Sequence, residues 1–319
     1  MKYYDNTRIS AYKTCPRLYY LRHVKHLVPE GTAIPLSFGL AWHEAMDVVW
    51  AMLNAGRTPE ETLKPAMERW KECWEVSGME FQPDMATQEK YGFRTPGVAA
   101  EMLINYMAHR RDFIQSVELI ATEPPFAVDL YEDENDVKYI GRLDKVVKHR
   151  EHGKLVIEHK TTSAYAKASG FRTDYVGSWS PNSQIDGYLH AGHMLYGEIK
   201  GVWIDAALVH KTVHNKFRFI PIDRQFEQLD VWLHETQDWI KRIEDEAAGA
   251  QDSSYGGYPK NTGNCYIYGG CAYRDICKFV AKPHDRVDNF TGFKVSRWEP
   301  FDVLKIEQLG LEPERKDES

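Results

Sequence analysis

Apolar residues recur along this chain with two different periods, which separate predicted helices from predicted strands. A helical period predicts helices over 36–53, 58–76, 96–116, 181–196 and 223–248. A pattern rich in β-branched and aromatic residues predicts strands over 118–130, 139–149, 154–159, 202–210 and 216–220. Strands in the middle of the chain, with helices before and after them, indicate an α/β domain whose mixed β-sheet is covered on both sides.

The stretches between these elements are polar and predict connections. Residues 7–26 predict a short N-terminal helix entered through Ser10. Residues 77–96 predict a loop or flap, and the aromatic stretch 163–180 predicts a loop on the substrate side of a site. The charged tail 312–319 is expected to be disordered.

The two central strands predict a β-hairpin. Residues 151–153 between them suit a three-residue loop in which Gly153 takes the left-handed backbone position. With the strand before them, 118–130, they predict a three-strand meander.

The register of this hairpin brings charged residues together. A three-residue loop that pairs residue 150 with residue 154 sets Asp144 opposite Lys160. Glu158 is then a diagonal neighbour of Asp144 on the same face, because side chains on a strand alternate between faces. Two carboxylates and a lysine in this arrangement can hold a divalent metal ion and a phosphate.

These charged residues also have a plain structural interpretation. Asp144, Glu158 and Lys160 suit a cross-strand ladder of ion pairs on a solvated face. His43 lies inside a predicted helix, one turn before Asp47, and a single helical histidine is usually a structural or surface residue. The residues alone favour this interpretation over a catalytic one.

Composition places the chain among folded globular proteins. Its length of 319 residues is enough for one large or two medium domains. Of these residues 43% are hydrophobic and 13% aromatic, as in folded proteins. The first residues lack the apolar core of a signal peptide, and no apolar run is long enough to cross a membrane. We therefore expect a cytoplasmic protein with no membrane partner, whose cysteines stay reduced.

Charge is distributed unevenly along the chain. The net charge of −7 argues against a protein that simply coats nucleic acid. Acidic residues concentrate in 129–136 and 223–252, whereas basic residues gather in 17–26, 138–160 and 210–218. Basic strips on an acidic body suit a groove for a polyanion, and a mixed-charge solvated surface explains the same pattern equally well.

The five cysteines form one cluster and two outliers. Cys265, Cys271 and Cys277 follow one another at close intervals, while Cys15 lies far upstream and Cys73 stands in a predicted helix. Three clustered thiolates and one distant one can bind zinc or an iron–sulfur cluster. The absence of CxxC pairs argues against zinc, and unconnected buried thiols are the alternative, to which we assign Cys73.

Five short motifs occur in an order that matches one known family. Four of them are His43 in GLAWHEAMD, Asp144 in GRLD, EHK at 158–160, and Gln184 and Tyr188 in QIDGY, and the fifth is the set of cysteines before and after these. With these five motifs, the chain resembles the PD-(D/E)XK nuclease superfamily. The resemblance is to its RecB/AddB-like iron–sulfur branch, which includes stand-alone CRISPR-associated and viral exonucleases. It implies a restriction-endonuclease-like core with a central mixed sheet flanked by helices.

The resemblance implies a divalent metal site for Mg²⁺ or Mn²⁺. Its ligands are expected to be His43, Asp144 and Glu158, with the carbonyl of Ile157 or His159. An imidazole among the ligands makes manganese a suitable metal.

The remaining motif residues are expected to act beside the metal. Lys160 would orient or deprotonate the attacking water and offset phosphate charge. Gln184 and Tyr188 would position the DNA strand or the lysine, and Glu123 is an outer-shell acid.

Four cysteines are expected to bind a [4Fe–4S] cluster that joins the two ends of the chain: Cys15, Cys265, Cys271 and Cys277. The domain organisation that follows is an N-terminal helical segment, a nuclease core, an iron–sulfur segment and a partly disordered tail, at 1–35, 36–250, 251–300 and 301–319.

The implied function is a metal-dependent DNA exonuclease that acts on linear ends, single- or double-stranded, in recombination, repair or end processing. A CRISPR-adaptation nuclease that works in a complex, a non-catalytic iron–sulfur protein that binds DNA ends, and a zinc-stapled interaction protein are the alternatives. No glycine-rich run matches the GxxxxGK[ST] pattern of helicases, so a helicase, recombination or CRISPR-adaptation protein is an expected partner.

Overall fold

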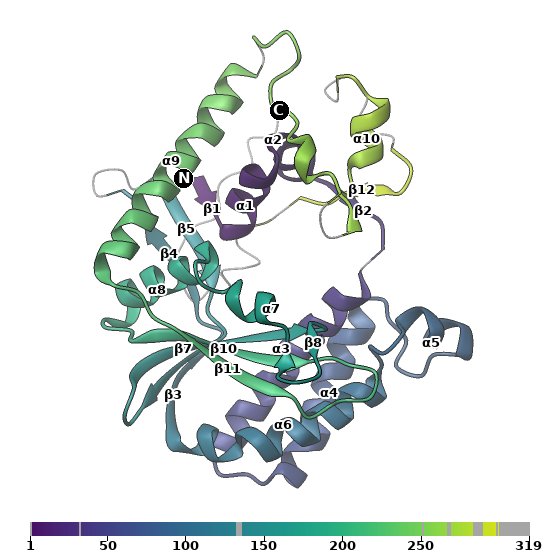
Figure 1. Ribbon diagram of the computed structural model, residues 1–319, viewed down its shortest axis with the longest axis vertical. Helices are drawn as coiled ribbons and strands as arrows, with labels where there is room; N and C mark the ends of the chain where they lie inside the picture. Colours follow the sequence, from purple (N-terminus) through teal and green to yellow (C-terminus); the bar gives the residue numbers. More distant parts are fainter. Residues whose placement is uncertain are drawn as a thin grey trace. The chain divides into compact units, whose positions relative to one another are not determined.

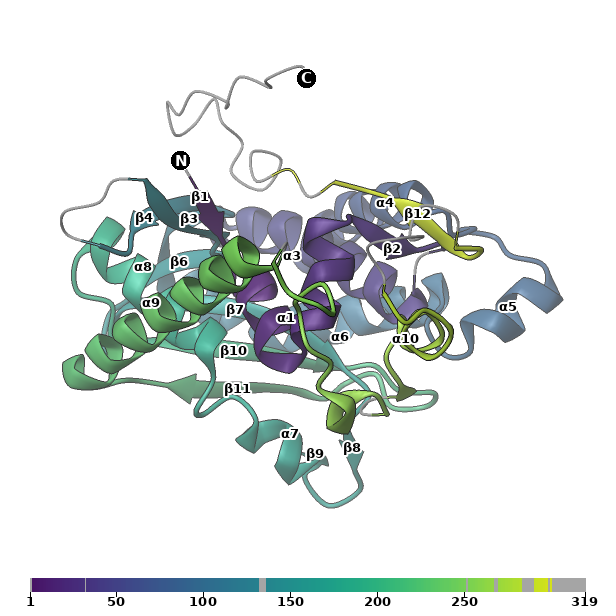
Figure 2. The same ribbon diagram turned by 90° about the horizontal axis from the view of Figure 1, so that it is seen from above.

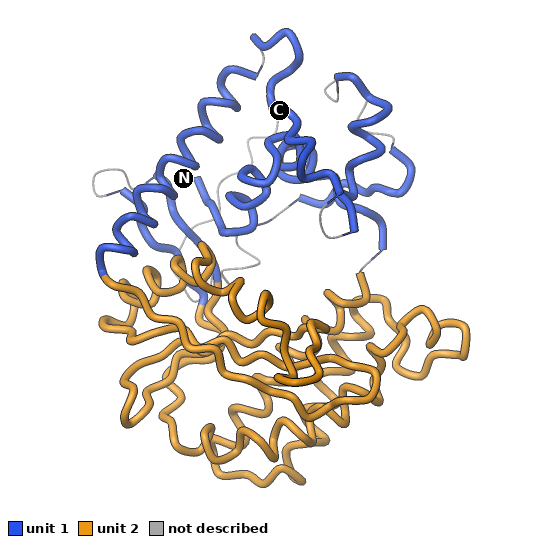
Figure 3. Tube along the Cα trace, in the orientation of Figure 1, with its two compact units in different colours: residues 1–31, 125–141, 226–319 blue, residues 32–124, 142–225 orange. Residues whose placement is uncertain are grey.

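The chain divides into two compact units, each built from separate stretches of sequence (Figure 3). Unit 1 comprises Met1–Gly31, Pro125–Gly141 and Phe226–Ser319, and unit 2 comprises Thr32–Pro124 and Arg142–Gln225. The computed structural model describes residues 2–31, 33–131, 136–250, 252–266, 269–282, 290–297 and 299.

Unit 2 is a mixed α/β unit (Figure 1). Its helices are α3 (Ile34–Asn54), α4 (Pro59–Val76), α5 (Met85–Tyr91), α6 (Pro96–Ser116), α7 (Thr173–Gly177) and α8 (Ser183–Tyr196). Its strands are β3 (Val117–Thr122), β6 (Lys145–His149), β7 (Gly153–Thr162), β8 (Tyr165–Ala166), β9 (Gly170–Phe171), β10 (Gly201–Leu208) and β11 (Phe217–Ile222).

Five of these strands form the central sheet, in the order β11-β10-β7-β6-β3. The pair β7–β10 is parallel, whereas β3–β6, β6–β7 and β10–β11 are antiparallel. Figure 1 shows α3, α4 and α6 on one face of the sheet and α8 on the other. The predicted α/β fold with a central mixed sheet flanked by helices is thereby confirmed.

The core of unit 2 is rich in aromatic residues, and it fixes α3 against the sheet. Trp42 and Trp50 of α3, Trp70 and Trp74 of α4, and Tyr106 of α6 are at most 1% exposed. They join sheet residues of β6, β7 and β10 in one hydrophobic cluster. Large apolar side chains contribute most of the burial free energy, so α3 is held firmly along the sheet.

Unit 1 contains shorter elements. Its strands are β1 (Lys2–Tyr4), β2 (Leu27–Pro29), β4 (Pro125–Asp129), β5 (Val137–Arg142, of which Arg142 belongs to unit 2) and β12 (Phe293–Val295). Its helices are α1 (Asn6–Thr14), α2 (Pro16–Tyr19), a π-helical turn (Tyr20–Val24), α9 (Phe226–Gly249), a 3-10 turn (Thr262–Asn264) and α10 (Arg274–Phe279).

Elements from distant parts of the sequence pack together in unit 1. The strands form a sheet β1-β5-β4 and a pair β12-β2. Figure 2 shows α1 beside α9, where the Tyr12 hydroxyl donates to the carbonyl of Arg242 at 3.3 Å.

Several sequence-based boundaries prove wrong. The strand predicted over 139–149 is two strands, because the chain leaves β5 at Arg142 and enters β6 at Lys145 in a different sheet. The strand predicted over 118–130 is likewise divided into β3 and β4. The first helix begins after Asp5, whose carboxylate accepts from the N–H of Arg8 at 2.6 Å, rather than at Ser10.

Two predicted loops contain regular structure. Residues 77–96 include α5, and residues 163–180 include the β8–β9 pair and α7. The predicted tail at 312–319 lies outside the described residues. Every helix in the described part of the chain is too short or too polar to span a lipid bilayer.

Candidate active site

The β6–β7 hairpin places two acidic residues level with each other. Lys145 pairs with Ile157 and His149 pairs with Gly153, so the turn consists of residues 150–152. Gly153 has the predicted positive φ of 72°. Asp144, directly before Lys145, is therefore level with Glu158, and the predicted register, which set Asp144 opposite Lys160, is wrong by two residues.

A two-residue shift leaves the assignment of faces unchanged, because side chains alternate along a strand. Leu155 and Ile157 of β7 join the hydrophobic cluster beneath α3. Glu158 and Lys160 therefore occupy one face, and the His159 ring lies on the other, among Trp50 and Tyr106. His159 thus points away from Glu158 and Lys160, as the alternation of side chains along a strand requires.

Asp144 contacts both the backbone of β7 and His43 of α3. Its Oδ2 accepts a hydrogen bond of 2.7 Å from the backbone N–H of His159 and lies 3.2 Å from His43 Nδ1. Burial favours the neutral acid, but the charge and hydrogen bond of His43, with the charge of Lys160, outweigh it. The pKa of Asp144 is consequently held well below its usual range, and this carboxylate is ionised.

Glu158 is 1% exposed and forms an ion pair with Lys160 through Oε1. Its other oxygen, Oε2, is buried and has no hydrogen-bond partner in the described part of the chain. Burial first, and then the negative charge of Asp144, raise the pKa of Glu158 to about 7. An additional cation on the free side of this carboxylate would remove its desolvation cost.

His43 reaches the two acids from α3. Gly39, one turn earlier, faces β7, because a methyl group there would lie in van der Waals contact with Thr161 Oγ1 at 3.4 Å. Burial lowers the pKa of His43, but the Asp144 carboxylate more than offsets this effect, so the pKa is raised. The Asp144 carboxylate that the imidazole contacts thus decides the direction of its pKa shift.

Lys160 completes the group and is 25% exposed through its side chain. Burial lowers its pKa, whereas the charges of Glu158 and Asp144 raise it by more, so the ammonium is charged. Its Nζ lies 6.0 Å from the centroid of the Trp179 ring. Trp179 comes from the stretch that the sequence predicted as a substrate-side loop.

The other predicted residues lie on neighbouring elements of unit 2. Gln184 Nε2 donates to the Tyr188 hydroxyl at 2.9 Å across one turn of α8, as their spacing predicted. Glu123 accepts from Arg142 Nη1 at 2.9 Å, and its backbone N–H donates to the carbonyl of Asp144 at 2.7 Å. Glu123 is thus tied to the Asp144 backbone through its own main chain.

The acids are paired with basic side chains rather than arranged around an open metal position. Within the described ranges, no three His, Cys, Asp or Glu side chains are placed so that they could hold a metal ion. The donor set of two carboxylates and an imidazole, with a buried carboxylate oxygen left unpaired, nevertheless fits a divalent cation.

The comparison with protein families decides the assignment. Residues 6–278 match the model of the PD-(D/E)XK nuclease superfamily, which is most of the 319-residue chain. The chain belongs to the PD-(D/E)XK nuclease superfamily. This membership supports a hydrolytic nuclease and confirms the family that the five motifs resemble.

Two solved structures are similar to this superfamily member. A crystal structure of a candidate exonuclease from Eubacterium rectale is 14% identical, with 95% of this chain and 92% of that chain covered and a TM-score of 0.49. The crystal structure of SSO0001 is 14% identical, with 74% of this chain and 85% of that chain covered and a TM-score of 0.28. No curated protein matches the chain.

The structure distinguishes the ExK motif of this nuclease from a second one in the sequence. Glu198 and Lys200 have the same spacing as Glu158 and Lys160 and also form an ion pair. The side chain of Glu198 is 71% exposed, whereas that of Glu158 is 2% exposed. The buried pair beside Asp144 is therefore the candidate, and the exposed pair is a natural control.

Unit 1 brings together the cysteines from both ends of the chain. The backbone N–H of Asn261 donates to Cys15 Sγ at 3.3 Å, and the N–H of Cys271 donates to the carbonyl of Cys265 at 2.9 Å. Burial first, and then the neighbouring Cys15 and Cys265 thiols, raise the pKa of Cys271. Cys277 also has a raised pKa, because of burial and of its neighbours Cys15 and Cys271.

Cys73 is separate from this group, on α4 of unit 2. Its thiol is free and half-buried, and burial raises its pKa. We keep its assignment as an unconnected thiol.

Proposed function

We propose that this chain is a divalent-metal-dependent deoxyribonuclease that digests linear DNA from its ends, in recombination, repair or end processing. One observation supports the site above all: Asp144, directly before β6, is level with Glu158 of β7. His43 of α3 contacts Asp144, and Lys160 of β7 contacts Glu158. All four residues belong to unit 2. A surface ladder of ion pairs does not explain why Glu158 is buried with one oxygen unpaired.

His43, Asp144 and Glu158 would hold Mg²⁺ or Mn²⁺. When bound, the ion supplies Lewis acidity that lowers the pKa of a water molecule and neutralises phosphate charge. The unpaired Oε2 of Glu158 is available to the cation as it stands. His43 and Asp144 would have to exchange their mutual contact for the cation.

Lys160 could act in two ways, as a charged hydrogen-bond donor or as a base, and these require different protonation states of its amine. While it is paired with Glu158 its ammonium is charged, and a charged lysine offsets the negative charge of a phosphate and orients water by donating a hydrogen bond. It can accept a proton from water only after its own pKa falls, which follows if a cation takes over the charge of Glu158. The structure therefore favours orientation and charge neutralisation as its first role.

Gln184 and Tyr188 would position the DNA strand. Their side chains are linked by a hydrogen bond, so each restrains the rotamer of the other. Two restrained polar groups on one face of α8 are suited to hold a phosphodiester backbone.

Cys15, Cys265, Cys271 and Cys277 would hold a [4Fe–4S] cluster in unit 1. The hydrogen bonds of Asn261 and Asn264 to the carbonyl of Thr14, at 3.1 and 2.6 Å, already fasten the two ends of the chain together at this point. A cluster here would close a long loop of the chain and stabilise the fold of unit 1, whereas the proposed catalytic residues belong to unit 2.

The decisive experiment compares end-labelled linear DNA with closed circular DNA, in Mn²⁺, Mg²⁺ or EDTA. Wild type is expected to degrade only the linear DNA and only with metal. Glu158→Ala should lose this activity, and Glu198→Ala, which changes the exposed ExK motif, should retain it. Linear DNA that survives with every metal, or cleavage that persists in Glu158→Ala, would reject the proposal.

A further inference from the structure

Three aromatic side chains form a row that ends at Lys160. Phe171 and Tyr175 are stacked, with ring centroids 6.2 Å apart and an interplanar angle of 21°. Tyr175 then meets Trp179 edge to face at 5.8 Å and 88°. The Trp179 ring lies 6.0 Å from Lys160 Nζ. The row therefore runs from β9 through α7 to the proposed catalytic lysine.

The far end of this row is anchored, and the near end is accessible. Phe171 is 3% exposed, and β9 pairs with β8 through Tyr165. The N–H of Arg172 also donates to the carbonyl of Ala164 at 2.9 Å, which fixes the start of α7. Tyr175 and Trp179, by contrast, are only half-buried. A partly exposed Trp179 ring, held in the row by its anchored neighbours, is suited to receive a flat ligand.

We propose that Trp179 forms a stacking subsite for the base of an unpaired nucleotide next to the scissile phosphate, and that Tyr175 holds its ring in place. This inference rests on the proposed nuclease function and deepens it. Lys160 would neutralise the phosphate, and the base attached to that nucleotide would lie on the Trp179 ring, perpendicular to the ring of Tyr175. Aromatic rings accept any base, since every base has a π face.

Such a subsite selects for unpaired nucleotides. A base inside a duplex is covered on both faces by its neighbours, and unstacking it costs a few kcal/mol. A base in a single strand or at a frayed end can leave its neighbours at lower cost. The subsite thus predicts that the enzyme takes its substrate as a single strand.

The test measures binding without cleavage. Glu158→Ala and wild type, both in EDTA, are titrated into three labelled ligands of equal length: an oligo-dT strand, an abasic strand with the same phosphates, and a blunt duplex. In both backgrounds, Trp179→Leu should weaken binding of oligo-dT about tenfold, the size of one lost base stack. Trp179→Phe should restore most of the affinity, and neither change should affect the abasic strand or the duplex.

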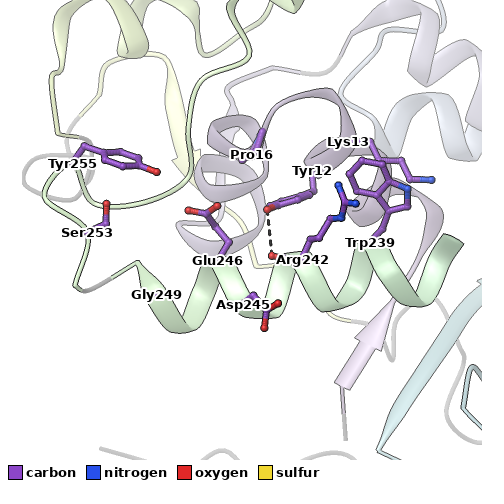
Figure 4. Close-up of a pocket in the computed structure, with 10 residues that line it drawn as sticks. All are labelled: Tyr12, Lys13, Pro16, Trp239, Arg242, Asp245, Glu246, Gly249, Ser253 and Tyr255. Carbon is purple, nitrogen blue, oxygen red and sulfur yellow. Dashed lines mark hydrogen bonds between the residues drawn. The ribbon is translucent and has the colours of Figure 1, made fainter. Parts of the chain in front are cut away.

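A matched control exists in unit 1. Figure 4 shows Trp239 on α9, in a pocket of about 590 Å³ that also contains Lys13 and Arg242. Lys13 Nζ lies 5.4 Å and Arg242 Cζ 4.9 Å from the centroid of its ring. Trp239 thus resembles Trp179 in its cationic neighbours, but Asp245 and Glu246 in the same pocket disfavour a phosphate. Trp239→Leu should leave binding of oligo-dT unchanged.

Tyr175→Leu gives a second variant in case Trp179→Leu disturbs the fold, and it should reduce affinity for oligo-dT alone. If Trp179→Leu and Tyr175→Leu bind oligo-dT like the parent while cleavage still depends on Glu158, the subsite is rejected and the nuclease stands. An equal loss on abasic and duplex ligands would also reject it, because the rings would then support DNA binding in general. If Glu158→Ala cleaves like wild type but oligo-dT binding depends on Trp179, the assignment of the catalytic site to Glu158 fails and base stacking is retained.

Discussion

Lys145 Nζ lies 2.7 Å from Asp47 Oδ1, and the two residues join the helix and the strand that carry two of the proposed metal ligands. Asp47 follows His43 by one turn of α3, and Lys145 follows Asp144 directly. Lys145 is 1% exposed, and its side chain points to the face opposite Glu158, toward the aromatic core. This ion pair therefore sets the position of His43 relative to Asp144 from beneath the site.

Removing one partner of this pair should be costly. Asp47→Asn leaves a buried ammonium without its counter-charge, and we expect a loss of about 3 kcal/mol in the free energy of unfolding. Lys145→Met should cost less, since Met fills the space and Asp47 is partly exposed. Urea unfolding measures both. The control is Glu118→Gln, in the exposed pair with Lys148, which should change stability by less than about 0.5 kcal/mol.

The same pair should matter for the metal. Because Asp47→Asn loosens α3 against β6, Mn²⁺ measured by calorimetry should bind several-fold more weakly to this variant than to Glu118→Gln. Equal Mn²⁺ affinity in the two variants would mean that the Lys145–Asp47 pair contributes to stability and not to metal binding.

Lys160→Ala should abolish DNA cleavage while fold and DNA binding remain nearly intact. The Lys160 ammonium donates to Glu158 Oε1, and its charge is needed where the phosphate is attacked. Rates on end-labelled linear DNA and affinities in EDTA separate the two effects. Lys200→Ala, in the exposed ExK motif, should cleave like wild type. Retained cleavage in Lys160→Ala would remove the lysine from the mechanism.

The sequence predicts elements well where local chemistry sets their ends. The α4 helix begins after Thr58, whose side chain and that of Glu61 form a capping box, and its predicted bounds are correct. The bounds of α6 are also correct, with Thr95 as the capping residue before Pro96. These signals lie within a few residues of the boundary, so no knowledge of distant contacts is needed.

Contacts between distant segments account for the errors. The strand predicted over 139–149 is continuous in its β-propensity, yet β5 and β6 pair with different sheets. Gly141, just before the break, faces the Phe126 ring so closely that a methyl group would lie 2.5 Å from Cζ. The glycine of the GRLD motif thus has a packing reason that the motif does not reveal.

The candidate site was predictable as a set of motifs but not as a geometry. The register error arose because Gly153 is the first residue of β7 and not the last of the turn. The order of the motifs selected the ExK motif at 158–160, and burial separates it from the exposed one at 198–200. Lys145 was missed because its partner Asp47 is distant in the sequence. Trp179 was missed because a loop separates it from Lys160.

Acid should destabilise the protein through His23. Its pKa is lowered to about 3, first because the ring is buried and then because Arg22 and Arg8 lie near. An unfolded histidine has a pKa of about 6.5, so between these values only the unfolded state binds the proton. The stability that depends on neutral His23 is complete above pH 6.5 and is lost as the pH falls toward 3.

Replacing this ring should reduce the acid sensitivity. His23→Phe keeps a ring against Tyr19, whose centroid lies 5.4 Å from that of His23. Between pH 7 and pH 5 the variant should lose about 1 kcal/mol less stability than wild type, after allowance for the partial exposure of the ring. Urea unfolding at both pH values tests this, with the exposed His234→Phe as control. Parallel losses in all three proteins would contradict it.

Cys271→Ala should remove the proposed cluster and show that it serves the fold rather than the chemistry. Anaerobically purified wild type is expected to be brown, with an absorbance band near about 400 nm from iron–thiolate bonds. The variant should lose this band and unfold at lower urea, because the two ends of unit 1 are no longer cross-linked. Residual cleavage by the folded fraction should keep its dependence on Glu158.

The control is Cys73→Ala, on α4 of unit 2, which removes an equally free thiol and should change neither colour nor stability by much. An unchanged spectrum in Cys271→Ala would mean that this thiol is not a ligand. A wild-type protein that is colourless and binds zinc would show that the cysteines form a zinc site and not an iron–sulfur cluster.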